Sequence, residues 1–112
     1  MSNTKSNLRV LFMGTPDFAV PSLKALIENF DVIGVVTQTD KPRGRGNTVL
    51  PTPIKVVALE NNIPVYQPNT FKDFAFENEL KALDPDVIAV VAYGKLLPEY
   101  VLNYPRLGCI NV

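Results

Sequence analysis

The apolar residues of this chain gather in short, nearly continuous runs. These runs cover residues 8–13, 32–36, 64–66, 87–91 and 107–112, and Arg9 alone interrupts the first of them. Apolar runs without polar alternation are typical of strands that are buried on both faces, as in a parallel sheet. The pattern therefore predicts five strands, of which residues 64–66 carry the weakest signal and residues 87–91 the strongest.

Segments of helical periodicity separate these runs. Thr15-Pro16 and Thr52-Pro53 each place a capping residue before a proline, which predicts a helix start at both positions. Further helices are predicted over residues 71–83 and 98–103. The first helix presents one apolar stripe, formed by Ala19, Leu23, Leu26, Ile27 and Phe30. The alternation of strands and helices predicts an α/β fold, namely a Rossmann-like doubly wound and mostly parallel sheet.

Length and composition support one domain. The chain has 112 residues, 46% of them hydrophobic, and its 11 basic residues balance its 11 acidic ones. Residues 1–7 are polar and are expected to be a disordered lead-in without a signal peptide, whereas residues 8–112 are expected to form the domain. The last apolar run stops at Val112 without a turn signal, so we expect the sheet to be cut after its fifth strand.

The residue types exclude several classes of protein. A single cysteine excludes a disulfide framework and a cysteine-rich zinc site, and the chain contains no histidine, the commonest proton carrier near neutral pH. No apolar run approaches the roughly 18 residues of a membrane span. A cytoplasmic protein without membrane contact is the expectation.

Ligands of a doubly wound sheet bind at the carboxyl ends of the strands, where three loops are expected. In the first, Gly14 would allow close approach of a ligand to the backbone, and the following helix start would offer N–H groups to an anion. The segment lacks a G-x-G-x-x-G pattern, and Thr37-Gln38 rather than an acid follows the second strand, so NAD is disfavoured. A plain capped turn is the alternative interpretation.

The second loop covers residues 38–52 and is far longer than the about 2–6 residues usual between a strand and a helix. Lys41, Arg43 and Arg45 stand there among glycine and proline, a composition suited to phosphate contacts. A P-loop pattern is absent from the sequence. A solvated, mobile basic loop is the alternative.

The third loop, Ala92–Leu97, follows the strongest strand. Tyr93, Gly94, Leu96 and Leu97 could line a pocket for a flat heteroaromatic ring, although ordinary packing under a loop is the alternative. Asn111 is unusual in an apolar strand and could donate hydrogen bonds to a reacting carbonyl oxygen, unless it simply ends the strand. Cys109 is interpreted as a core residue.

Four segments in this order resemble the bacterial methionyl-tRNA formyltransferases, and the resemblance runs from about Leu8 to the end of the chain. They are Leu11–Ala19 (LFMGTPDFA), Thr37–Gly46 (TQTDKPRGRG), Val90–Pro98 (VVAYGKLLP) and Pro105–Val112 (PRLGCINV). The basic loop is the most discriminating of the four, because related formyltransferases that act on glycinamide ribonucleotide or amino sugars generally lack it.

The resemblance implies transfer of a formyl group from 10-formyltetrahydrofolate to the amino group of methionyl initiator tRNA, in translation initiation and without a metal. It assigns the formyl oxygen to Asn111 and the folate pocket to Tyr93, Gly94, Leu96 and Leu97. It places Gly14, Thr15, Pro16 and Asp17 at the methionyl-adenosine end, and Lys41, Arg43 and Arg45 at the acceptor stem.

The resemblance also implies groups that these 112 residues do not contain. The family pairs its asparagine with a histidine two residues later and with a later aspartate, so the histidine would directly follow Val112. We therefore expect an N-terminal fragment that is inactive alone, from an enzyme that is a monomer at full length. The alternatives are another folate-dependent formyltransferase, such as one acting on a sugar nucleotide, and a non-catalytic nucleotide-binding domain of the same fold.

Overall fold

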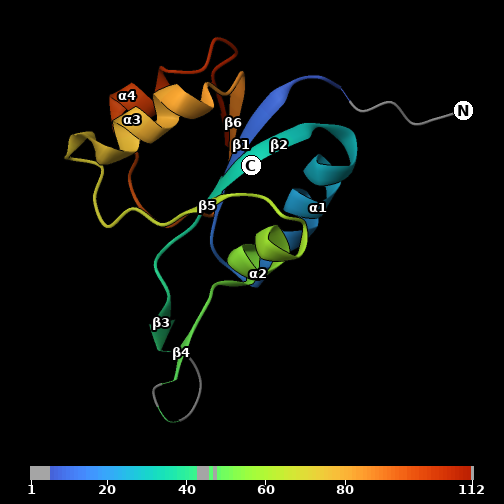
Figure 1. The fold of residues 1–112 in the computed structure, drawn as a ribbon, viewed down its shortest axis with the longest axis vertical. Coiled ribbons are helices and arrows are strands. Elements are labelled where there is room, and N and C mark those ends of the chain that lie inside the picture. Colours follow the sequence, from blue (N-terminus) through green and yellow to red (C-terminus); the bar gives the residue numbers. More distant parts are fainter. Residues whose placement is uncertain (1–5, 43–45, 47, 112) are drawn as a thin grey trace, which may run out of the picture.

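A computed structural model describes residues 6–42, 46 and 48–111. Within these residues, five strands form one sheet in the order β5-β2-β1-β6-β7 (Figure 1). The strands are β1 (Arg9–Gly14), β2 (Asp31–Val36), β5 (Val65–Tyr66), β6 (Val87–Val91) and β7 (Cys109–Asn111). Each neighbouring pair in the sheet is parallel, which confirms the predicted mostly parallel α/β fold.

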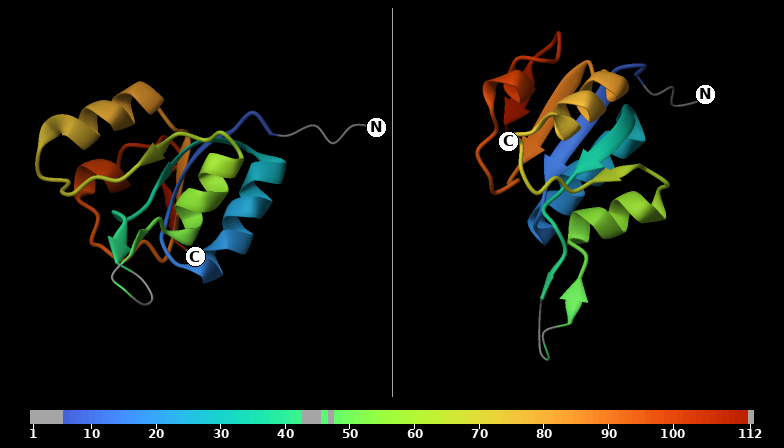
Figure 2. Two further views of the ribbon diagram at one scale, coloured as in Figure 1. Left: turned by 60° about the horizontal axis from the view of Figure 1, so that its bottom comes forward. Right: turned by 60° about the vertical axis from the view of Figure 1, so that its left-hand side comes forward.

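Helices cover both faces of the sheet. A 3-10 turn η1 (Asp17–Ala19) leads into α1 (Val20–Asn29), which lies on one face with α2 (Pro53–Glu60). The opposite face carries α3 (Phe74–Leu83) and α4 (Glu99–Leu102), as the two rotated views of Figure 2 show. The chain moves outward through β2 and β5 and then returns past β1 to β6, so the winding direction reverses between β1 and β6. A reversal of this kind opens a crevice at the carboxyl ends of the strands.

The side chains of β1 explain why its apolar run has no polar alternation. Val10 and Phe12 pack in the core cluster with α1 and α2, whereas Leu11 and Met13 pack in the cluster with α3 and α4. Successive side chains of a strand point to opposite faces, so a central strand covered on both sides must be apolar throughout. Buried Leu23 confirms the predicted α1 stripe, and α2 buries Ile54, Val57 and Ala58 against the same face.

The two threonine-proline signals have different outcomes. Thr52 caps α2 as predicted, since its hydroxyl accepts a hydrogen bond from the Lys55 N–H at 3.1 Å. The prediction that Thr15 caps the first helix is wrong. Pro16 occupies the cap position of η1 without a side-chain bond, and the Thr15 hydroxyl donates instead to the Tyr93 carbonyl oxygen at 2.8 Å. The Thr15 hydroxyl therefore makes a tertiary hydrogen bond instead of the local capping bond that the sequence pattern predicted.

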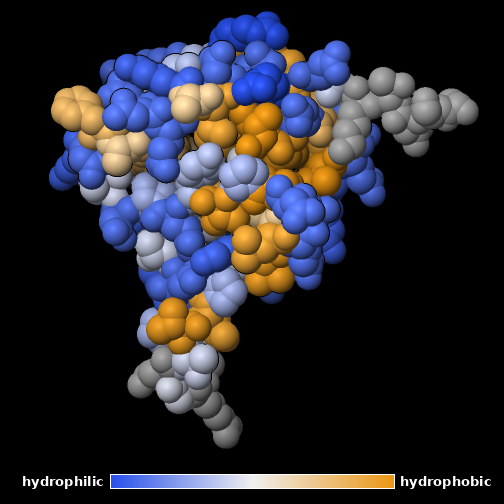
Figure 3. All heavy atoms as spheres, viewed as in Figure 1, coloured by the Kyte–Doolittle hydropathy of each residue, from blue (hydrophilic) through white to orange (hydrophobic). Residues whose placement is uncertain are grey.

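The long segment after β2 contains an antiparallel pair, β3 (Lys41–Pro42) and β4 (Val49–Leu50), that the sequence pattern did not predict. This hairpin extends from the body of the molecule (Figures 1 and 2). Val49 and Leu50 are both exposed, and Figure 3 shows hydrophobic surface at this end of the molecule. Two-residue strands with outward apolar side chains lack the period by which a strand is recognised.

At the start of the described chain, the Ser6 N–H donates to the Asn29 carbonyl oxygen at 3.0 Å, while residues 1–5 of the expected lead-in lie outside the described residues. Of the helices in the described ranges, none combines the length and the apolar composition that crossing a membrane requires.

Candidate functional site

The carboxyl ends of the parallel strands bring four segments of the sequence to one edge. Gly14 ends β1, Thr37 and Gln38 follow β2, residues 92–97 follow β6, and Asn111 ends β7. We call this the ligand edge and define it by residues 14–17, 37–42, 92–97 and 111. The edge lies at the reversal point of the sheet, which is where doubly wound proteins bind ligands.

Gly14 allows β1 and β6 to remain close at this point. A Cβ at Gly14 would lie 2.7 Å from the Val91 carbonyl oxygen and 2.8 Å from the Phe12 ring. The next three residues do not form a simple anion cradle. Pro16 has no N–H to donate, and the exposed carboxylate of Asp17 lies in the first turn of η1. Whether residues 14–17 face a methionyl-adenosine end stays a prediction.

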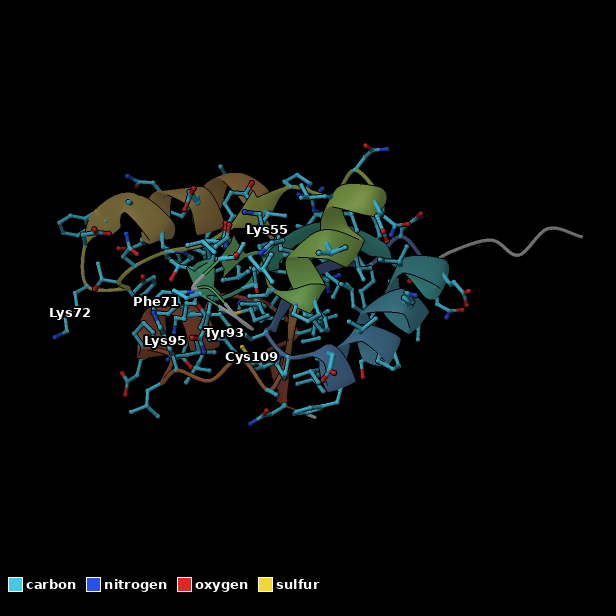
Figure 4. All side chains as sticks on the ribbon, turned by 90° about the horizontal axis from the view of Figure 1, so that it is seen from below. Lys55, Phe71, Lys72, Tyr93, Lys95 and Cys109 are labelled. Carbon is cyan, nitrogen blue, oxygen red and sulfur yellow. The ribbon has the colours of Figure 1, made fainter. Side chains whose placement is uncertain are left out.

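Tyr93 points inward rather than toward a ligand. Its ring is 1% exposed and lies in the core cluster of α3 and α4, with its centroid 6.0 Å from that of Phe71. Among the described residues its hydroxyl has no hydrogen-bond partner, and burial raises the pKa of Tyr93 to about 12. Figure 4 shows Tyr93 and Phe71 within the molecule and Lys72 extending away from it. The buried Tyr93 side chain therefore anchors the 92–97 loop to the core.

A depression of about 410 Å³ joins two groups that the sequence predicted separately. Its lining includes Tyr93, Gly94, Lys95 and Leu96 from the loop together with Asn111. Asn111 is exposed, and it is in register with Val90 on β6. The Asn111 carboxamide is therefore accessible to a ligand among the described residues.

Leu96 and Leu97 do not face the same space. Leu96 is 97% exposed and borders both the first depression and a second one of about 550 Å³. Leu97 lines the second depression, whose wall also includes Phe71, Pro98 and Tyr100 together with Thr70 and Lys72. The predicted folate segment therefore separates two adjoining hollows.

The base of the β3–β4 hairpin is fixed by polar contacts. The Thr37 and Thr52 hydroxyls are hydrogen-bonded at 2.8 Å, and both residues are fully buried. The Asp40 carboxylate accepts from Lys55 Nζ at 3.0 Å and from the Gln67 amide at 2.7 Å. These bonds attach the first residues of the hairpin to α2 and to the segment after β5.

Of the three predicted phosphate contacts, Lys41 lies on β3 and is exposed, with Nζ donating to Gln38 Oε1 at 3.0 Å. Arg43 and Arg45 lie outside the described residues. Gln38, Asp40, Lys55 and Gln67 were not singled out from the sequence. Only the position of Gln38 and Asp40 directly after a strand pointed to the ligand edge; Lys55 and Gln67 gave no signal, because their partners are distant in the sequence.

Cys109 has the environment of a core thiol. Its Sγ lies 3.5 Å from the Leu102 carbonyl oxygen, and burial raises its pKa, which disfavours the nucleophilic thiolate. In the described part of the chain, no group of three or more His, Cys, Asp and Glu side chains could hold a metal ion.

The fold and the ligand edge together define a doubly wound α/β domain with a depression at the carboxyl ends of its strands, next to the β3–β4 hairpin. Solved formyltransferases share this fold. Phosphoribosylglycinamide formyltransferase from Anaplasma phagocytophilum superposes with a TM-score of 0.64 at 16% identity, covering 95% of this chain and 49% of that one. Glycinamide ribonucleotide transformylase 1 from Geobacillus kaustophilus gives 0.62 at 17% identity, covering 94% and 56%.

Relatives identified by sequence are much more similar to this chain than these solved structures are. The formyl transferase family model matches residues 7–112, and the chain belongs to this family. Methionyl-tRNA formyltransferase of Clostridioides difficile strain 630 is 55% identical over 106 residues, and that of Pelotomaculum thermopropionicum is 59% identical over 106. Each match covers 94% of this chain and 34% of the relative, so the chain spans about a third of the length of these relatives.

Proposed function

We propose that this chain carries part of the active site of an enzyme that transfers a formyl group from 10-formyltetrahydrofolate to the amino group of methionyl initiator tRNA. One observation carries the proposal: identity of 55% over 94% of the chain to a protein named methionyl-tRNA formyltransferase. The three basic residues between positions 41 and 45 of the sequence favour a nucleic-acid substrate over the small ribonucleotide substrates that the solved structures' names imply.

The chemistry requires few groups. The methionyl amine adds to the formyl carbon and loses a proton, the formyl oxygen gains negative charge, and the C–N10 bond then breaks as N10 of tetrahydrofolate takes up a proton. The Asn111 carboxamide is accessible at the edge and can donate to the developing oxyanion. The resemblance assigns the proton transfer to a histidine and an aspartate of the family, neither of which matches a position of this chain.

The substrates are assigned to the ligand edge by position. The depression formed by residues 92–96 and Asn111 would take the folate ring, with the formyl group next to Asn111. Residues 14–17 would face the methionyl-adenosine end, and the hairpin with Lys41, Arg43 and Arg45 would contact the acceptor stem. The reaction is proposed to need no metal, and the enzyme to act in the cytoplasm as a monomer.

The test is formyl transfer by the protein expressed from its complete gene. We expect formylation of methionyl initiator tRNA with 10-formyltetrahydrofolate as the donor. Asn111→Asp keeps the shape of the side chain but removes both donors, so kcat should fall by about 100-fold or more. Asn78→Asp, the same change at an exposed position of α3, serves as the matched control and should leave kcat unchanged.

Formylation of a nucleotide sugar or a ribonucleotide in place of the tRNA would overturn the substrate. Equal kcat values for Asn111→Asp and the wild type would overturn the role of Asn111 while leaving the substrate intact.

A further inference from the structure

Two loops of the ligand edge meet on one side chain, that of Gln38. Its Nε2 donates to the Tyr93 carbonyl oxygen at 2.8 Å, and its Oε1 accepts from Lys41 Nζ at 3.0 Å. Tyr93 belongs to the 92–97 loop and Lys41 to the hairpin. The carboxamide thus bridges two segments that lie more than 50 residues apart in the sequence.

The chemistry of the two partners specifies an amide at this position. A lysine ammonium can only donate, and a backbone carbonyl can only accept. The bridging group must therefore accept at one end and donate at the other. Glutamate cannot donate to Tyr93, arginine and lysine cannot accept from Lys41, and serine is too short to reach both.

The loop side of this bridge has little free space. Gly94 has a φ of +93°, and a Cβ at this residue would lie 2.3 Å from Gln38 Nε2. The Tyr93 carbonyl also accepts from the Thr15 hydroxyl at 2.8 Å, so both of its lone pairs are used. The backbone of the 92–97 loop is therefore held against Gln38 from two directions.

The hairpin side is equally fixed. The Gln67 amide donates to the Gln38 carbonyl oxygen at 3.1 Å and to Asp40, while Thr37 is bonded to Thr52 beneath. These contacts hold the backbone of Gln38, whereas its side-chain amide reaches the other loop. Replacing Gln67 therefore removes bonds at the base of the hairpin, whereas replacing Gln38 removes the bond between the hairpin and the 92–97 loop.

We propose that Gln38 is a positioning residue that sets the 92–97 loop relative to the hairpin, with Lys41 orienting its amide, so that the loop is held in the shape that binds the formyl donor. Gln38 acts through the backbone of Tyr93 rather than by touching the donor. The inference rests on the proposed function for the identity of the ligand, and on the contacts above for the positioning.

The experiment compares Gln38→Met with Gln67→Met in the protein expressed from its complete gene. Both variants replace a glutamine by a side chain of similar length at the base of the hairpin, but only the first loses a bond to the Tyr93 carbonyl. Binding of 5-formyltetrahydrofolate is measured by calorimetry, and backbone hydrogen exchange of residues 94–97 is followed without ligand.

Gln38→Met should weaken binding about tenfold, the effect of one lost bond to a fixed group, while Gln67→Met stays within about twofold. Gln38→Glu should weaken it as much, because it keeps an acceptor for Lys41 and loses the donor. In steady-state assays Gln38→Met should raise the KM for the donor. Its kcat should stay within about twofold of the wild-type value, because the interaction contributes equally in the ground and transition states. Exchange at residues 94–97 should accelerate in Gln38→Met alone.

Equal weakening by the two methionine variants, or unchanged exchange at residues 94–97 in Gln38→Met, would overturn the positioning role. Should Gln38→Met fail to fold, Gln38→Glu against Gln67→Met still separates the bond to the Tyr93 carbonyl from the bonds made by Gln67. The exchange comparison needs no ligand, so it decides the role of Gln38 whether or not the wild-type protein transfers a formyl group. Absence of formyl transfer by the wild-type protein would refute the proposed function alone.

Discussion

The hydroxyl of Tyr93 lies among apolar side chains beneath the 92–97 loop. It is a buried group with no partner in the described residues, whereas the hydroxyl of Tyr100 in the same core cluster donates to the Phe71 carbonyl oxygen at 2.9 Å. A buried polar group that has lost its water and gained no bond is destabilising. Removing the hydroxyl should therefore have opposite effects on stability at Tyr93 and at Tyr100.

Tyr93→Phe should therefore increase the free energy of unfolding, by about 1 kcal/mol, since it removes an unpaired hydroxyl without changing the shape of the ring. Tyr100→Phe should lower the free energy by a similar amount because it breaks a bond. Urea denaturation of the two variants and the wild type measures both. A loss of stability in Tyr93→Phe would mean that its hydroxyl has a partner after all.

The raised pKa of Tyr93 predicts that the folded protein loses stability at alkaline pH. Below pH 10 the phenol is protonated in both the folded and the unfolded chain. Above pH 10 the unfolded chain releases the proton, while the folded chain holds it until the pKa of about 12. Rising pH therefore favours unfolding between pH 10 and about 12. The stability advantage of Tyr93→Phe should grow over this range in matched thermal melts, and a constant difference would contradict the raised pKa.

Single residues show where sequence reasoning fails. The capping pattern at Thr15 was sound locally, but the hydroxyl contacts Tyr93, 78 positions away. The deciding partner is distant in the sequence, and composition cannot report it.

At the scale of elements, the hairpin is the least expected part of the fold, and side-chain hydrogen bonds fix its base. The Thr37–Thr52 hydroxyl pair closes this base, and Thr52 also caps α2. Each hydroxyl is buried, so each needs the other.

A double-mutant cycle should show this dependence. Thr37→Val should cost about 1–2 kcal/mol by leaving the Thr52 hydroxyl with fewer bonds, and Thr52→Val about 2–3 kcal/mol because the cap is lost as well. The double variant should cost less than the sum of the two by about 1 kcal/mol. Chemical denaturation of the four proteins provides the cycle. Strict additivity would show that the two hydroxyls do not depend on each other.

The main strands and helices could be predicted because each carries its own local signal. The continuous apolar runs located β1, β2 and β6, since strands covered on both faces tolerate few polar residues. The hairpin could not be predicted, because β3 and β4 have two residues each and are held by contacts at their base rather than by an apolar face. The positions of the loops at the ligand edge followed from the predicted topology, while the contacts between them did not.

For the molecule as a whole, charge is distributed unevenly along the sequence although the net charge is zero. Three of the 11 basic residues of the chain fall between residues 38 and 52. A phosphate backbone that binds here would release counterions, so the affinity for tRNA should fall as the salt concentration rises.

Arg45→Ala, introduced in the complete gene product, should weaken binding of methionyl initiator tRNA and lower the slope of log K against log salt by about 1. Arg106→Ala, which removes an exposed arginine paired with Asp86 at the opposite end of β6, should leave the slope unchanged. Filter binding at several salt concentrations measures both slopes. Identical slopes for Arg45→Ala and the wild type would refute the phosphate contact.

The position of β1 at the centre of the sheet has a consequence for biosynthesis. β1 finds its first neighbour, β2, within the first 36 residues, but its other edge pairs with β6 at residues 87–91. At translation rates of about 5–20 residues per second, more than 50 residues must be added between these pairings, so that edge stays uncovered on the ribosome for roughly 3–10 seconds or more. An unpaired strand edge is a template for aggregation. The nascent chain thus passes through a stage at which the central strand of its sheet is paired on one edge only, and chaperone binding at this stage would protect it.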